Sequence, residues 1–253
     1  TLYPFDFAFD DSARIKDLLS FAVHLTARGK EMVIGADAAF GQPFRGKIGE
    51  LRIYREALTP SQVEQETQSD PATKGMPGPA ASYSFAADAG EMLRDDSGNG
   101  NHGRLVGQPQ WVSQEGRGGL ALSGRGQYVV VPNSPSIDVA GRSLTIAMSI
   151  ILEDSSTDGV ILSKPWRRGV MAPPYHQYAV EFGKLEKSVD FYFGDPRGRQ
   201  RGPFSVHPPI GIWTHIVFVY NGTVRGYVDG RELLAVSTRE FDLTDITGNL
   251  FLF

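Results

Sequence analysis

The sequence predicts an all-β fold in which two antiparallel sheets pack face to face as a sandwich. Short apolar runs follow one another at intervals of about 8–12 residues with no helices between them, which is typical of such sandwiches. The 29 glycines and 16 prolines can supply the turns that many short strands need. Residues 214–220 are apolar on both faces, and this predicts a central strand.

The N-terminal segment carries the strongest helical pattern. Apolar residues at positions 15, 18, 19, 22 and 23 share one helical face and predict a helix over residues 10–29, with its body at 11–28. From residue 32 the spacing of the apolar residues changes to the period of β-strands, and residues 32–34 and 47–54 predict two strands. Thr59, followed by Pro60 and Gln62, predicts a short helix that begins with a capping box.

Residues 66–80 lose this periodicity and gather Pro, Gly and Ala, so we interpret them as a linker. A series of short strands follows. The pairs Asn221-Gly222 and Asp229-Gly230 flank one apolar run and predict β-hairpin turns. The clearest predicted strands cover residues 81–85, 127–131, 144–152, 178–182, 189–193, 214–220, 223–228 and 250–253.

Composition narrows the classes of function. The net charge is −4 and no basic stripe stands out, so we expect no nucleic-acid partner. The absence of cysteine excludes disulfides, thiolate zinc sites and iron–sulfur clusters. No apolar run is long enough to span a membrane. The chain begins at Thr1 without a leader pattern, and we expect it to be a fragment or a processed product.

Four segments of the sequence together carry a resemblance to a known family. They are DDSGNGNHGRL at 95–105, ALSGRGQYVVVPNSPSIDV at 121–139, IGIWTHIVFVYNGTVRGYVDGREL at 210–233 and FRGKIGELRIYREALTPSQV at 44–63. Together they resemble the laminin-G-like, concanavalin A-like jelly-roll family. The resemblance implies a jelly-roll sandwich that serves as a carbohydrate- or protein-binding module of a larger secreted or cell-envelope protein, often with one calcium ion.

The order of these segments departs from the family pattern, because the 44–63 segment resembles the family's last strand. We interpret residues 1–65 as the C-terminal part of one repeat, with last strands at 30–56. Residues 81–253 are then a jelly-roll domain that lacks its final strand. The early segment either ends a preceding repeat or supplies the missing strand, within one chain or by exchange between chains. We expect it to pack on the sandwich, since an open sheet exposes an edge.

The resemblance implies a calcium site at Asp95, with Asn99 or Asn101 nearby. Clustered oxygen ligands beside glycines suit calcium, but the same residues also make ordinary turns. The family's last strand usually carries an aspartate, whereas this chain has Gly49 between Ile48 and Glu50. Glu50 or Asp88 would then have to complete the ligand set.

A second candidate site is the loop at 164–178. An aromatic side chain beside arginines can stack on a sugar ring and bind its hydroxyl or carboxylate groups. The alternative is a surface loop whose tryptophan covers the edge of the sandwich. The candidate ligand-binding residues are Trp166, Arg167, Arg168, Tyr175 and His176.

Catalysis has little support in the sequence. Glu240, Asp242 and Asp245 nearly match the acidic strand of jelly-roll glucanases, but residues five apart on a regular strand point to opposite faces. No nucleophile elbow, phosphate-binding loop or paired-histidine motif is present. We therefore expect a binding module and no enzyme. The alternatives are an assembly module that joins copies through free sheet edges and, third, a glycoside hydrolase.

Overall fold

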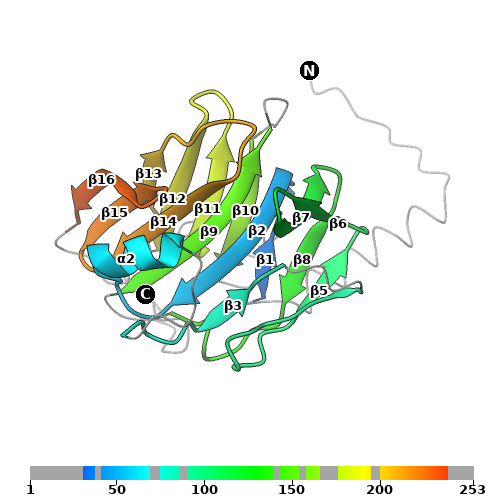
Figure 1. Ribbon diagram of the computed structural model, residues 1–253, viewed down its shortest axis with the longest axis horizontal. Coiled ribbons are helices and arrows are strands. Elements are labelled where there is room, and N and C mark those ends of the chain that lie inside the picture. Colours follow the sequence, from blue (N-terminus) through cyan, green and yellow to red (C-terminus); the bar gives the residue numbers. More distant parts are fainter. Residues whose placement is uncertain are drawn as a thin grey trace, which may run out of the picture.

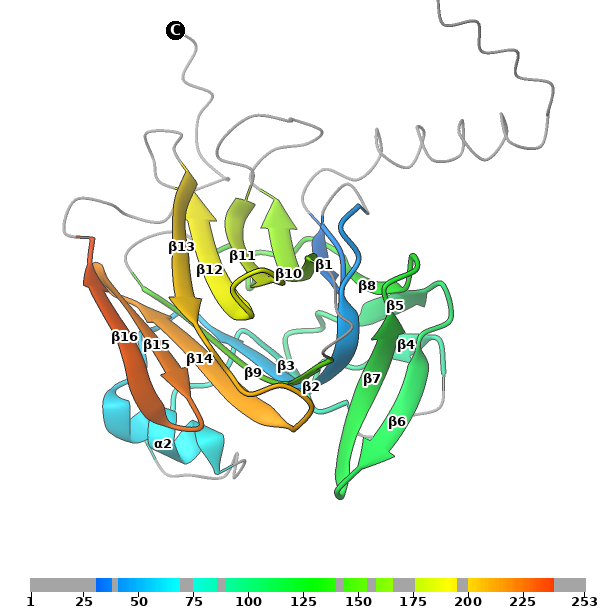
Figure 2. The same ribbon diagram turned by 90° about the horizontal axis from the view of Figure 1, so that it is seen from above.

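The computed structural model of the chain describes residues 31–37, 41–68, 75–85, 90–139, 143–153, 158–165, 176–194 and 200–238. These residues form a sandwich of two antiparallel sheets, which confirms the predicted fold class (Figures 1 and 2). The helix predicted over residues 10–29 and the strand predicted over 250–253 lie outside the described residues.

Sheet 1 is built from β1 (Met32–Ile34), β4 (Met92–Leu93), β5 (Gly103–Val106), β8 (Tyr128–Val131), β10 (Gly159–Pro165), β11 (His176–Gly183), β12 (Ser188–Gly194) and β13 (Gln200–Val206). Within the described residues its order is β13-β12-β11-β10-β1-β8-β5-β4. Pro203, which cannot donate a ladder hydrogen bond, lies in β13 at one edge of this sheet, where prolines are tolerated.

Sheet 2 is built from β2 (Arg45–Tyr54), β3 (Ala81–Tyr83), β6 (Gln110–Gln114), β7 (Arg117–Ser123), β9 (Leu144–Leu152), β14 (Thr214–Tyr220), β15 (Thr223–Val228) and β16 (Arg231–Ser237). The described strands run β16-β15-β14-β9-β2-β7-β6, and β3 also pairs with β2. As predicted, β14 is an interior strand that is buried along its whole length.

The first two strands of the described chain occupy the middle of both sheets. β1 pairs with β10 and with β8, while β2 pairs with β9, β7 and β3. All these partners belong to the same chain. The early segment therefore joins the two halves of each sheet and leaves no gap in either.

The core lies between the sheets and includes a stack of aromatic rings. Phe191 of β12 stacks on Phe218 of β14 with 5.4 Å between ring centroids. Phe193 of β12 lies against Tyr220 of β14, with 4.6 Å between ring centroids. These rings are fully buried and connect sheet 1 to sheet 2.

Helix α2 (Pro60–Thr67) lies on the outer side of sheet 2 (Figure 2). The predicted capping box is present, because the Gln62 N–H donates to the Thr59 hydroxyl and the Thr59 N–H donates to the Gln62 side chain. The helix extends two residues into the predicted linker. Its Val63 packs in a small second core on the outer face of sheet 2 with Tyr54, Leu58, Ala147, Val217, Val219 and Tyr227.

Both predicted hairpin turns are present, at Asn221-Gly222 between β14 and β15 and at Asp229-Gly230 between β15 and β16. Asp229 and Gly230 both have positive φ, as a type I′ turn requires. The described part of the chain contains no helix that is long and apolar enough to cross a membrane.

Candidate functional site

The loop after β4 contains the predicted metal ligands and is organised around Asp95. Oδ1 of Asp95 accepts hydrogen bonds from the backbone N–H groups of Ser82 and Ser97, at 2.9 and 3.0 Å. Oδ2 accepts from the Ser97 hydroxyl and from the Asn101 N–H, each at 2.8 Å. Burial alone would raise the pKa of Asp95, but these four donors outweigh it and hold the pKa below its ordinary value.

The side chains of both asparagines in the loop donate hydrogen bonds to backbone carbonyls, Asn101 from a buried position and Asn99 from an exposed one. Nδ2 of Asn101 donates to the Ala80 carbonyl at 2.8 Å, and its Oδ1 accepts from the Ser134 hydroxyl. Nδ2 of Asn99 donates to the carbonyls of Pro79 and Ala80, at 3.2 and 3.0 Å. The structure thus brings Asp95, Asn99 and Asn101 together as one hydrogen-bonded turn.

Glu50 belongs to a different cluster. It lies on β2, where its Oε1 is 3.8 Å from Nη2 of Arg52. Arg52 itself pairs with Glu66 of α2 at 2.7 Å. Glu50 therefore takes part in the polar contacts beneath the helix. Asp88, the other proposed ligand, lies outside the described residues.

The Asp95 loop as it stands does not fit a calcium ion. Calcium takes about six to eight oxygen ligands, and each must offer a free lone pair. Both Asp95 oxygens already accept two protons each, and the Asn101 oxygen accepts a hydroxyl. The described residues also hold no cluster of three or more His, Asp or Glu side chains suited to a metal.

Of the five residues predicted to bind a ligand, the described chain includes only His176. It is the first residue of β11, where its Nδ1 lies 3.2 Å from the Ser163 hydroxyl and its Nε2 lies 3.5 Å from Oε1 of Glu181. Trp166, Arg167, Arg168 and Tyr175 fall outside the described residues. The same holds for Glu240, Asp242 and Asp245.

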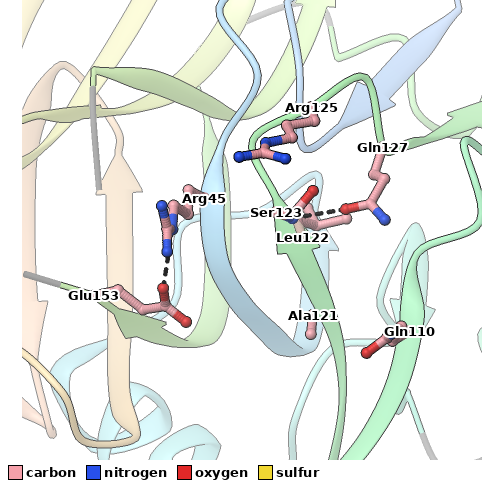
Figure 3. A pocket seen from close by; sticks show the side chains of 8 residues that line it. All are labelled: Arg45, Gln110, Ala121, Leu122, Ser123, Arg125, Gln127 and Glu153. Carbon is pink, nitrogen blue, oxygen red and sulfur yellow. Dashed lines mark hydrogen bonds and ion pairs between the residues drawn. The ribbon is translucent and has the colours of Figure 1, made fainter. Parts of the chain in front are cut away.

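One rim of sheet 2 carries a shallow pocket of about 320 Å³, called here the rim pocket (Figure 3). Four strands of the sheet have one terminus at this rim. Arg45 begins β2 and Gln110 begins β6, while Ser123 ends β7 and Glu153 directly follows β9. The lining residues are Arg45, Gln110, Ala121, Leu122, Ser123, Arg125, Gln127 and Glu153.

Hydrogen bonds and one ion pair hold the walls of the rim pocket. Nε of Arg45 lies 3.2 Å from Oε2 of Glu153 across the ends of β2 and β9. The Ser123 N–H donates to Oε1 of Gln127 at 2.7 Å, and Nε2 of Gln127 donates to the carbonyl of Gln108 at 3.1 Å. The Gln127 amide is thus fixed at both ends and closes one side of the pocket.

A tight turn presents Arg125 to the pocket. Gly124 and Gly126 both have positive φ, which only glycine adopts readily, and Arg125 is exposed between them. A Cβ on Gly124 would lie 3.2 Å from the Cβ of Arg45, so the turn packs directly against the first residue of β2. Figure 3 shows the Arg125 guanidinium directed toward the side where Arg45 and Glu153 lie.

A second pocket, of about 260 Å³, lies at the other end of β2, beside Tyr54, Asn99 and Ser136. Some of its polar side chains form hydrogen bonds within the protein. The Asn99 amide binds two carbonyls, and the Tyr54 hydroxyl donates to Glu66 at 2.6 Å. The exposed residues Arg55 and Glu56 also line this pocket.

Comparison of the chain with family models, with curated proteins and with solved structures found no match. The laminin-G-like character of the sequence therefore stays a resemblance, and the function rests on the geometry of the chain itself.

No sequence pattern indicates the rim pocket as a whole. Gly124-Arg125-Gly126 is recognisable as a turn, because glycine supplies the positive φ that tight turns require. Its partners could not be found in this way, because Arg45 and Glu153 are 108 positions apart and meet only through the pairing of β2 with β9.

Proposed function

We propose that this chain is a non-catalytic recognition module that binds carbohydrate through the rim pocket. The observation that carries the proposal is a solvent-open hollow where strand ends bring together guanidinium, amide and hydroxyl groups. Sugar hydroxyls both donate and accept hydrogen bonds, so a mixed set of such groups suits them.

Three of these groups are available to a ligand. Among the described residues, Arg125, Gln110 and the Ser123 hydroxyl have no side-chain hydrogen bond or ion pair. They are carried by β6, β7 and the turn beyond it, whose backbones are fixed by the ladders of sheet 2. A rigid frame of this kind lowers the entropy lost on binding.

The pocket lacks the groups of a retaining or inverting glycosidase. Those enzymes use two carboxyl groups about 5–10 Å apart, whereas among the described residues that line this pocket Glu153 is the single carboxylate, and it is paired with Arg45. Recognition without turnover is the function that this chemistry supports best.

The test is a glycan array probed with the full chain, followed by titration of the strongest hits. Arg125→Ala should weaken binding about tenfold, because it removes a charge-assisted donor. Arg117→Ala is the matched control, since Arg117 is also exposed but lies at the opposite end of β7. Silence across the array, or equal loss in both variants, would overturn the proposal. Trp166→Ala tests the loop predicted from the sequence in the same assay.

A second candidate function is assembly of copies through a free sheet edge. β16 is an edge strand of sheet 2, and its Leu233 and Val236 are 48% and 39% exposed. Exposed apolar edge strands favour pairing with another chain. Sedimentation velocity over a range of concentrations tests this candidate: growth in mass that Leu233→Lys abolishes would favour assembly, and a constant monomer mass would exclude it.

A further inference from the structure

We infer that the rim pocket selects saccharides that carry an anionic oxygen group, a carboxylate or a sulfate, and that Glu153 acts as an internal competitor for that group. The inference rests on the proposed function and adds the charge of the ligand and a residue that sets selectivity.

The first step concerns Arg125. Its guanidinium is exposed and has no ion pair or hydrogen bond within the described chain, and it points into the pocket (Figure 3). A guanidinium offers two parallel N–H donors that match the two oxygens of a carboxylate or the edge of a sulfate. An unpaired arginine at the mouth of a polar pocket therefore favours an anion over a neutral sugar.

The second step concerns Arg45, whose charge is already met by Glu153. The contact is made through Nε at 3.2 Å, and both side chains are more than a third exposed. Exposed ion pairs of this kind contribute little to stability, so an incoming anion can exchange with the carboxylate. The Glu153 carboxylate also repels an anionic ligand that approaches Arg45.

The charged residues have different roles. Arg125 attracts the anionic group, and Glu153 competes with that group for Arg45. Replacing Glu153 with glutamine keeps the size of the side chain and removes the competing charge. The variant should therefore bind anionic saccharides more tightly and leave neutral saccharides almost unchanged.

The experiment uses two matched pairs of probes on the full chain: trigalacturonic acid against its methyl ester, and dextran sulfate against dextran. Isothermal titration at low and at high salt measures each pair. We expect binding of an anionic member at least tenfold tighter than binding of its neutral partner, with an advantage that shrinks as salt rises. Preference for trigalacturonic acid alone, or for dextran sulfate alone, supports the inference and identifies the anionic group.

Variants separate the roles. Arg125→Ala should remove most of the preference for the anionic probe, Glu153→Gln should increase affinity for that probe about threefold, and Arg117→Ala should change neither. Thermal melting checks that each variant is folded. Equal binding of the charged and neutral probes at the pocket would overturn this inference and leave the proposed function standing. Failure of every saccharide to bind would overturn both.

Discussion

Asp95 connects three pieces of the sandwich rim with one carboxylate. Its four donors come from Ser82 in β3, Ser97 in the loop and Asn101 ahead of β5. The family resemblance predicted this aspartate and the neighbouring asparagines as calcium ligands, and the ordinary turn was the alternative, since Asp, Asn, Ser and Gly concentrate in turns. It could not separate a hydrogen-bonded turn from a metal loop, since both use the same residue types.

Replacing Asp95 with asparagine should lower the free energy of unfolding by about 2 kcal/mol, because a neutral amide cannot satisfy four donors. Asp96→Asn is the control, since Asp96 is exposed, and it should change stability by no more than about 0.5 kcal/mol. Urea denaturation measures both. The melting temperature of the wild-type chain should be the same with calcium and with chelator. A clear rise with calcium would contradict the conclusion that this loop is a hydrogen-bonded turn.

His215 makes stability depend on pH. Burial lowers its pKa below the ordinary value of 6.5, while the carboxylates of Glu66, Glu50 and Asp229 oppose the shift. The unfolded chain therefore binds a proton at a higher pH than the folded chain, and the free energy of unfolding falls as pH drops below about 6.5.

Urea curves at pH 7.5, 6.5 and 5.5 test this dependence. The wild-type chain should lose stability across the series, and His215→Gln should flatten the part of the loss that comes from this histidine. Identical pH profiles for the two proteins would contradict the assignment.

At the scale of elements, α2 is attached to sheet 2 by a buried polar contact. Oε1 of Glu66 accepts from Arg52 at 2.7 Å and Oε2 accepts from the Tyr54 hydroxyl at 2.6 Å, and all three residues are buried. Burial, followed by the nearby Glu66 charge, raises the pKa of Tyr54, so this hydroxyl stays protonated and acts as a donor.

Glu66→Gln should destabilise the protein by about 3 kcal/mol, because the buried Arg52 charge loses its 2.7 Å carboxylate partner and is left with the more distant Glu50 at 3.8 Å. Glu64→Gln changes an exposed glutamate on the same helix and should have little effect. Chemical denaturation of the two variants provides the comparison, and equal small losses would show that α2 does not depend on this ion pair.

Sequence predicted some elements better than others for physical reasons. The hairpins at Asn221-Gly222 and Asp229-Gly230 and the capping box at Thr59 follow from local turn and cap chemistry. β7 and β13 were not predicted, because each has glycine or proline within the strand and lacks apolar alternation. β16 was missed as well, because most of its residues are exposed on both faces of an edge.

At the scale of the whole molecule, the early segment decides where a binding site can form. β2 crosses sheet 2 from the rim pocket at Arg45 to the second pocket at Tyr54, a length of about 30 Å for its ten residues. The sequence indicated that this segment would pack on the sandwich, but not which strands it would pair with. The rim pocket depends on that pairing, because Arg45 reaches Glu153 only through the contact of β2 with β9.

The two rims also provide the most direct test of carbohydrate recognition at the rim pocket. Backbone amide NMR spectra of the full chain, recorded with increasing trigalacturonic acid and, in a second series, with increasing dextran sulfate, report which end of β2 meets the ligand. We predict saturable shifts at Gln110, Ser123, Arg125 and Gln127, with Asn99 and Ser136 unchanged. Shifts confined to Asn99 and Ser136, or no shifts at millimolar ligand, would contradict the account.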